Sequence, residues 1–264
     1  SGHYENGSEY FVYECDEFDH NFLHFNPYVA IITSIEHDHP DTYPTELDYF
    51  SAFQQFVAQS ETVVTWRSLE PILGAQDNVT YLDQPSPYLQ LRGEHNRRNA
   101  SLILEALQQF SLPAKYAADG LNKFPGTNRR FEKLANNLYS DYGHTPTEIA
   151  ATLQMARELS DTVVLVYQPH QNVRQHEIKD QYTDAIFADA DEVYWLPTYL
   201  SRENPELSIL TPAELTQALS SSVVRHDANL DDELWSNIQA CRSEGRLVLC
   251  MGAGTIDAWV REKI

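Results

Sequence analysis

The sequence contains few basic residues, few cysteines and no long apolar run. Its 264 residues include 18 Lys and Arg but 39 Asp and Glu, which gives a formal net charge of −21. This charge repels phosphate backbones and anionic lipid headgroups, so nucleic acid and membrane surfaces are poor partners. No segment approaches the roughly 18 to 20 apolar residues that span a bilayer, and the first residues do not resemble a secretory signal. We therefore expect a cytoplasmic protein.

Several chemical signatures are also missing. The cysteines Cys15, Cys241 and Cys250 are odd in number and have no CxxC spacing, which argues against a disulfide framework and a cysteine zinc site. The motifs GxxxxGK[ST], GxSxG and HExxH do not occur. If the protein binds a nucleoside triphosphate, the main phosphate cradle is therefore not among these residues.

The first half of the chain combines short apolar runs with one long amphipathic segment. Residues 10–15, 29–35 and 62–66 are continuous and rich in β-branched or aromatic side chains, which predicts buried strands. Residues 94–110 carry an apolar stripe at helical spacing and predict a long helix that begins after Gly93. Proline and glycine then interrupt the pattern, so we place a domain boundary near residue 124.

The second half alternates between strand and helix patterns. Residues 138–142, 162–168 and 246–251 predict strands, and residues 145–160 predict a helix. That helix begins with Thr145 as N-cap, a proline in the first turn and a glutamate three residues later, which forms a capping box. The alternation indicates a doubly wound parallel α/β sheet, in which ligands bind at the carboxyl ends of strands.

An acidic, histidine-containing region follows the first two predicted strands. Glu14 ends the first strand and His39 lies just beyond the second, so both fall at carboxyl ends of neighbouring strands. A carboxylate and a neutral imidazole placed in this way could share a divalent cation. His37 and Asp38 compete with His39 for that role, and a solvated acidic loop explains the same residues.

The start of the predicted helix at 94–110 carries His95, Asn96 and Asn99. Their amide and imidazole groups could bind a purine edge, although helix capping explains the same residue types. Further along, Arg129 and Arg130 follow a Pro-Gly hinge, from which a guanidinium could reach phosphate oxygens.

Polar residues also lie at the ends of two predicted strands in the second half. Asp141 and His144 follow one strand, and His170 and Arg174 follow the next, which suggests a cleft. The short Gly-Ala-Gly segment at 252–254 favours a tight turn over a phosphate cradle.

Taken together and in order, these segments resemble the Mur ligases, most closely those that join L-alanine to UDP-N-acetylmuramate. The resemblance covers nearly the whole chain, and its seven segments are YECDEFDHNFL, IEHDHPDTY, GEHNRRNA, GTNRRFE, DYGHTPTEI, YQPHQNVR and MGAG. It implies an α/β fold in two parts. Residues 1–123 would be the later part of a central ATPase domain without its P-loop, and residues 124–264 a Rossmann-like doubly wound C-terminal domain.

The implied activity is ATP- and Mg²⁺-dependent amide formation through an acyl phosphate, in the synthesis of peptidoglycan precursors. The implied substrates are UDP-N-acetylmuramate and L-alanine or a related amino acid. Without the UDP-sugar domain and the P-loop, the chain is expected not to turn over alone. The alternatives are a murein tripeptide ligase, another Mur-type ligase, or a non-catalytic binding protein derived from one.

The resemblance also implies roles for individual residues. The matched positions are Glu14 and His39 for magnesium, His95, Asn96 and Asn99 for adenine, Arg130 for the phosphates, Asp141 near the ribose, and His144, His170 and Arg174 for the amino acid and acyl phosphate. Three positions depart from the family pattern: Ser140 replaces an Asp, Thr145 replaces a His and Gln171 replaces an Arg. The last change removes a cation beside the expected carboxylate site, which leaves the identity of the amino acid open.

Overall fold

A computed structural model describes residues 6–7, 9–39, 41–110 and 114–264. The chain forms two compact units. Unit 1 comprises residues 1–89 and 98–121, and unit 2 comprises residues 90–97 and 122–264. Helix α3 (Glu94–Gln108) is therefore divided, because its first turn clusters with unit 2 and the remainder with unit 1.

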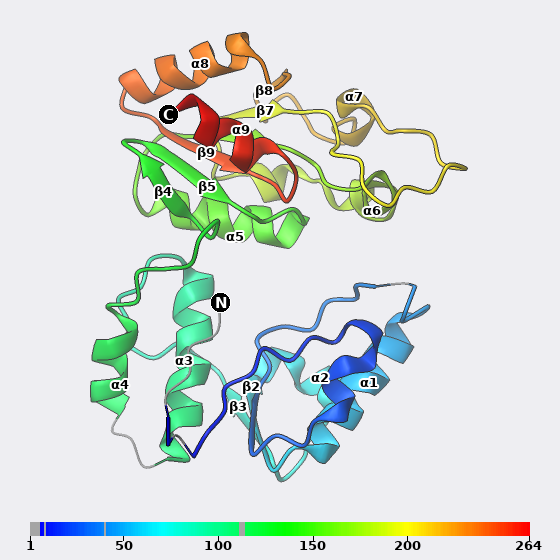
Figure 1. Ribbon diagram of the computed structural model, residues 1–264, viewed down its shortest axis with the longest axis vertical. Coiled ribbons are helices and arrows are strands. Elements are labelled where there is room, and N and C mark those ends of the chain that lie inside the picture. The colour runs from blue at the N-terminus through cyan, green and yellow to red at the C-terminus, as the bar shows by residue number, and fades with distance from the viewer. Residues whose placement is uncertain (1–5, 8, 40, 111–113) are drawn as a thin grey trace. The chain divides into compact units, whose positions relative to one another are not determined.

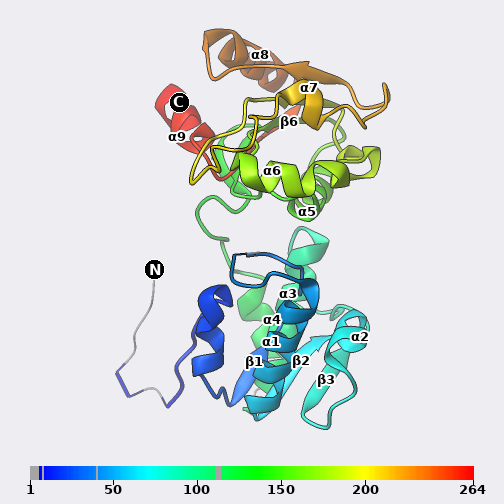
Figure 2. The same cartoon turned by 90° about the vertical axis from the view of Figure 1, so that its right-hand side faces the viewer.

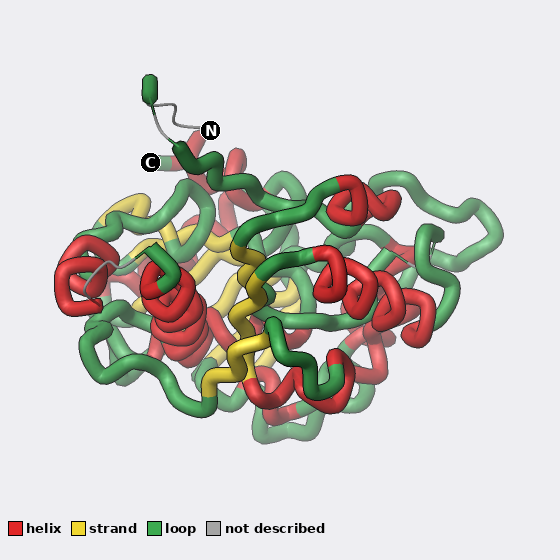
Figure 3. The backbone as a smooth tube through the Cα atoms, turned by 90° about the horizontal axis from the view of Figure 1, so that it is seen from below, coloured by secondary structure: helices red, strands yellow, loops and turns green. Residues whose placement is uncertain are grey.

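Unit 1 is built on a three-stranded parallel sheet in the order β1-β2-β3. The strands are β1 (Val29–Ile31), β2 (Thr62–Trp66) and β3 (Val79–Leu82). The helical elements are η1 (Phe18–His24), α1 (Glu46–Gln59), η2 (Arg67–Leu69), α2 (Glu70–Leu73), α3 and α4 (Ala114–Leu121). Val63 packs with α1 and α2, whereas Val64 and Trp66 pack with Leu102 of α3, so helices cover both faces (Figure 3).

The expected strand at residues 10–15 is wrong. This segment has no regular secondary structure, and the side chains of Phe11 and Val12 are 85% and 96% exposed. A run of apolar residues forms a strand only when a neighbouring strand satisfies its backbone groups. Within the described residues the sheet of unit 1 ends at β1, so Glu14 does not follow a strand.

Unit 2 contains a six-stranded sheet in the order β4-β5-β9-β6-β7-β8, in which only β4 runs antiparallel to its neighbour. The strands are β4 (Glu132–Ala135), β5 (Leu138–Asp141), β6 (Val163–Tyr167), β7 (Glu192–Trp195), β8 (Arg225–Asp227) and β9 (Leu247–Met251). The central strands β6 and β9 are buried along their whole length, as expected for a sheet covered on both faces. The predicted doubly wound α/β fold is confirmed.

Helices cover both faces of this sheet (Figures 1 and 2). They are α5 (Pro146–Arg157), α6 (Asn172–Ile178), η3 (Lys179–Gln181), η4 (Asp184–Phe187), α7 (Pro212–Leu215), α8 (Asp232–Ser243) and α9 (Ile256–Lys263). Residues of α5 pack in one core with Tyr167 and Trp195, and residues of α8 and α9 pack in another with Val164 and Val248. The predicted capping box of α5 is present. No helix in the described part of the chain is long and apolar enough to span a membrane.

Candidate functional site

Three of the predicted site residues meet at the carboxyl edge of the sheet in unit 2. His144 follows β5, His170 follows β6, and Arg174 lies on α6. Nη1 of Arg174 lies 2.7 Å from Nε2 of His144, and the two imidazole rings are 5.5 Å apart in an edge-on arrangement. The sheet topology explains this meeting, because β5 and β6 are parallel and both flank β9.

The contact with Arg174 fixes the tautomer of His144. A guanidinium can only donate hydrogen bonds, so Nε2 of His144 accepts and its proton lies on Nδ1. Nδ1 faces the carbonyl of Tyr142 at 3.2 Å and Oε2 of Glu148 at 3.6 Å. His144 is thus held between a cation and a carboxylate.

His170 is a neutral imidazole at pH 7. Burial, followed by the nearby His144 and Arg174, lowers the pKa of His170 to about 4. Its ring stacks on Tyr199 with ring centres 5.7 Å apart, and its buried Nδ1 has no hydrogen-bond partner. Sequence reasoning missed Tyr199, which lies 29 residues further along the chain and reaches His170 through an isolated β-bridge.

The glycine-rich turn after β9 allows close packing beside His170. A side chain at Gly252 would approach the carbonyl oxygen of Gln168 to 2.6 Å, and one at Gly254 would approach Cβ of Tyr199 to 2.6 Å. Gly252 also has φ +152°. These contacts agree with the predicted tight turn and explain why small residues are needed there.

Arg129 and Arg130, the two arginines considered for phosphate binding, have different surroundings. The side chain of Arg130 is 56% exposed and lies 3.6 Å from Oε1 of Glu148. Arg129 instead donates to the carbonyl of Gly252 at 3.2 Å and lies 3.5 Å from Oδ2 of Asp257. Arg130 is therefore the member of the pair with a solvent-accessible charge, as the proposed phosphate contact requires.

Asp141 is 5% exposed, and both of its oxygens are used by the backbone. Oδ1 accepts from the N–H of Gly143 and Oδ2 from the N–H of Phe131, each at 2.7 Å. Burial raises the pKa of Asp141, while these hydrogen bonds oppose the shift. The carboxylate organises the turn after β5, and the expected ribose contact stays a prediction.

The start of α3 packs against α5 within unit 2. His95 hydrogen-bonds to the backbone of Ala151, and burial lowers its pKa, although its Nδ1 is buried without a partner. Nδ2 of Asn96 donates to the carbonyl of Arg92 at 2.9 Å. Asn99 belongs to unit 1 and is exposed. The unpartnered Nδ1 of His95 is buried, and the expected contact of this segment with adenine stays a prediction.

Glu158 anchors this segment to α5. Its carboxylate accepts from Nη2 of Arg97 at 2.8 Å, from the N–H of Gly93 at 3.0 Å and from Gln154 at 2.7 Å. These contacts, above all the hydrogen bond from Arg97, lower the pKa of Glu158 to about 2. A carboxylate with a lowered pKa stabilises the fold above its ordinary pKa, and the contribution disappears as the pH falls toward 2.

We therefore expect Glu158→Gln to reduce the free energy of unfolding of unit 2 by about 2 kcal/mol at pH 7. The difference from wild type should shrink steadily between pH 5 and pH 2. Urea denaturation at several pH values measures it, with Glu206→Gln in an exposed loop as the control. A loss that stays constant over this pH range would contradict the assigned ion pair.

The predicted metal ligands lie in unit 1. Glu14 is exposed, whereas His39 is half-buried with Nε2 3.7 Å from Oε1 of Glu17. His39 and Glu17 are thus neighbours, and a shared Mg²⁺ ion stays a prediction. Sequence reasoning missed Glu17, which belongs to the same acidic run. In the described part of the chain no cluster of three metal-ligating residues occurs.

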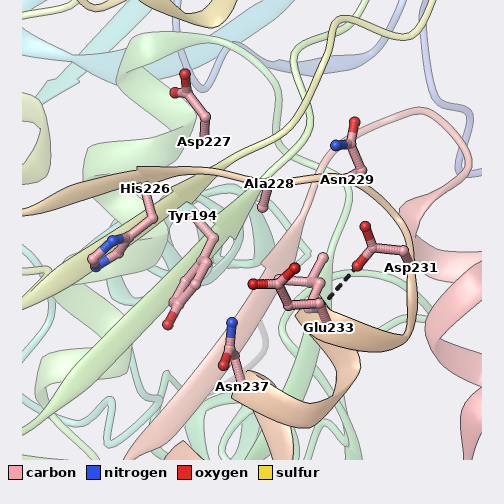
Figure 4. Close-up of a pocket in the computed structure, with 9 residues that line it drawn as sticks. Tyr194, His226, Asp227, Ala228, Asn229, Asp231, Glu233 and Asn237 are labelled. Carbon is pink, nitrogen blue, oxygen red and sulfur yellow. Dashed lines mark hydrogen bonds between the residues drawn. The ribbon is translucent and has the colours of Figure 1, made fainter.

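A concavity of about 260 Å³ lies elsewhere in unit 2, between the end of β8 and α8 (Figure 4). Its lining includes Tyr194, His226, Asp227 and Glu233. None of the predicted site residues lines it. The convergence of His144, His170 and Arg174 thus lies outside this concavity.

In a comparison with known proteins, two family models match successive parts of the chain. The Mur ligase middle domain matches residues 2–73, and the Mur ligase glutamate ligase domain matches residues 129–254. UDP-N-acetylmuramate--L-alanine ligase of Nocardioides sp. is 34% identical over 96% of this chain and 62% of its own length. The ligase of the same name from Maricaulis maris is 29% identical over 95% of this chain and 64% of its own. The chain thus spans about three-fifths of these relatives.

Solved structures share the fold. UDP-N-acetylmuramate-alanine ligase MurC of Thermotoga maritima superposes with a TM-score of 0.67 at 23% identity, over 91% of this chain and 60% of that one. Folylpolyglutamate synthase of Mycobacterium tuberculosis complexed with ADP superposes with a TM-score of 0.61 at 18% identity, over 92% and 64%.

Proposed function

Because this chain belongs to the Mur ligase family, we propose that it forms the later part of an ATP-dependent ligase that joins L-alanine, or a related amino acid, to UDP-N-acetylmuramate. Residues 1–123 would belong to the central ATP-binding domain and residues 124–264 to the C-terminal domain. The observation that carries the proposal is the convergence of His144, His170 and Arg174 at the sheet edge. The named relatives, of which the chain spans about three-fifths, support the substrates.

The proposed reaction has two steps. The muramate carboxylate attacks the γ-phosphorus of ATP, which releases ADP and gives an acyl phosphate. The amine of the amino acid then attacks the acyl carbon and phosphate leaves. Such chemistry depends mainly on positioning and on neutralising charge.

In this scheme Arg174 pairs with the carboxylate of the incoming amino acid, and His144 holds its guanidinium in place. The neutral His170 adds no positive charge that would repel the incoming amino group. Arg130 reaches the phosphates, and His95 with Asn96 and Asn99 meets adenine, while Asp141 lies near the ribose.

His39, together with Glu14 or Glu17, would hold Mg²⁺. The bound ion would neutralise phosphate charge during transfer. Glu17 is included beside Glu14 because its Oε1 lies 3.7 Å from Nε2 of His39.

The test compares this chain with a joined ligase, in which the N-terminal part of the Nocardioides relative is fused ahead of it. Phosphate release from Mg-ATP is measured with UDP-N-acetylmuramate and L-alanine each added or withheld. We expect release only from the joined ligase and only with both substrates, at a rate within the usual range of roughly 1 to 1000 per second.

Turnover at such a rate by this chain alone would contradict the proposal. A joined ligase that binds both substrates without releasing phosphate would instead favour a non-catalytic binding protein. Release that requires a murein tripeptide or another amino acid in place of L-alanine would keep the ligase and change the substrate. Gln171, which stands where the family has an arginine, makes this amino-acid panel informative.

A further inference from the structure

Three buried polar side chains form a hydrogen-bond chain between the loops that carry His144 and His170. It consists of Tyr167 at the end of β6, Tyr182 after η3, and Gln175 on α6, and each is 0% exposed. The hydroxyl of Tyr167 lies 3.0 Å from that of Tyr182, which lies 2.8 Å from Oε1 of Gln175. These side chains contact residues of the candidate site, and the sequence analysis did not predict them.

At each end, this hydrogen-bond chain meets the backbone carbonyl of a site residue. The hydroxyl of Tyr167 donates to the carbonyl of His144 at 2.9 Å. Nε2 of Gln175 donates to the carbonyl of His170 at 3.0 Å. The three side chains therefore connect the loop after β5 to the loop after β6, independently of the contact between Arg174 and His144.

The number of protons makes this connection sensitive to both loops. Between the two carbonyls there are four contacts, but each tyrosine supplies one proton and the amide of Gln175 donates at only one end. Burial raises the pKa of both tyrosines, so each keeps its proton. Three protons serve four contacts, and with Tyr167 donating to His144 and Tyr182 donating to Gln175 it is the contact between the two hydroxyls that lacks a proton. If the carbonyl of His144 moves away, Tyr167 can instead donate to Tyr182, so the hydrogen bonding of the two tyrosines depends on the position of that carbonyl.

We propose that Tyr182 and Gln175 are positioning residues that hold the backbone of His170 at a fixed place relative to His144. The proposal rests on the proposed function only in assigning the two histidines to the ligase site. Tyr182 is the central link. Without its hydroxyl, Tyr167 would contact only His144 and Gln175 only His170, and this connection between the two loops would be lost.

The test is a nuclear magnetic resonance titration of the histidine ring protons in this chain with Tyr182→Phe. Besides the stacked Tyr199, the charged or titratable groups near His170 are His144 after β5, Arg174 on α6 and Glu203 in the loop after β7. If His170 loses its fixed place, burial and the two neighbouring groups lower its pKa less. We expect its titration midpoint to rise by at least about half a pH unit. The Overhauser contact between the two imidazole rings should also weaken.

Tyr194→Phe is the matched control, because it removes a hydroxyl from β7 outside this chain of contacts. Titration curves and Overhauser contacts of Tyr182→Phe that match wild type and Tyr194→Phe would overturn the proposal. If Tyr182→Phe does not fold, Gln175→Met decides by the same two readouts, since it removes the contact with His170 and keeps both tyrosines. Dilute samples are needed because the sequence pI is about 4.7.

The titration requires no catalysis, so it is independent of the ligase assay. In the joined ligase we expect Tyr182→Phe to lower kcat about tenfold with KM for ATP nearly unchanged. An inactive joined ligase with shifted histidine titrations would reject the proposed function and retain the positioning role. An active joined ligase, together with histidine titrations that Tyr182→Phe leaves unchanged, would support the proposed function and reject the positioning role.

Discussion

Replacing Arg174 with methionine should lower kcat/KM of the joined ligase for the amino acid by about 100- to 1000-fold, or about 3 to 4 kcal/mol. Arg174 is half-buried, and Nη1 lies 2.7 Å from Nε2 of His144, so its guanidinium has a fixed direction. A charged group held in this way interacts strongly with a substrate carboxylate. Steady-state phosphate release at varied L-alanine concentrations measures the effect.

Two controls separate the local charge from general disturbance. Arg225→Met removes an exposed arginine of β8 in the same unit and should change kcat/KM less than about threefold. Arg174→Lys keeps the charge but loses the planar fork, so an intermediate loss is expected. If Arg174→Met behaves like Arg225→Met, Arg174 does not pair with the substrate.

The prediction of the fold from the sequence was most accurate for strands that are buried on both faces, because such strands are continuous apolar runs. The strand expected at residues 62–66 matches β2 at both ends, and the run at 246–251 contains β9. The same signal failed at residues 10–15, because side chains can be apolar without a neighbouring strand to bind the backbone. Helix α8 was not predicted, although Asp231 caps its N-terminus and Leu234 and Ile238 face the core.

For the candidate site, the sequence predicted residues that lie directly after strands. His144, His170 and Arg174 follow β5 and β6, and the rule that ligands bind at the carboxyl ends of parallel strands is enough to group them. Tyr199, Tyr182 and Gln175 reach the same place through tertiary contacts that no local spacing records. The metal site stays a prediction: His39 lies 3.7 Å from Glu17, whereas Glu14 is exposed.

The core beneath this site should be strongly sensitive to Trp195→Ala. Trp195 is 0% exposed, and its ring lies 5.2 Å from the rings of both Tyr167 and Tyr182 and 5.6 Å from that of Phe187. Truncating a buried tryptophan to alanine costs about 3 to 5 kcal/mol, because the removed ring leaves a cavity. Of the roughly 5 to 15 kcal/mol that stabilise a domain, this is a large part. Urea denaturation followed by circular dichroism measures the loss.

Trp195→Phe distinguishes the ring from its polar atom. The indole Nε1 of Trp195 is buried without a hydrogen-bond partner, so its removal eliminates an unsatisfied polar group while most of the aromatic packing remains. We expect a loss below about 1.5 kcal/mol for Trp195→Phe. Equal losses for the two variants would contradict this account. Hydrogen exchange should locate the loss from Trp195→Ala in β6 and β7 and leave β2 of unit 1 protected as in wild type. Because Trp195 packs against both tyrosines, Trp195→Ala should also disturb the hydrogen-bond chain between His144 and His170, whereas Trp195→Phe should preserve it.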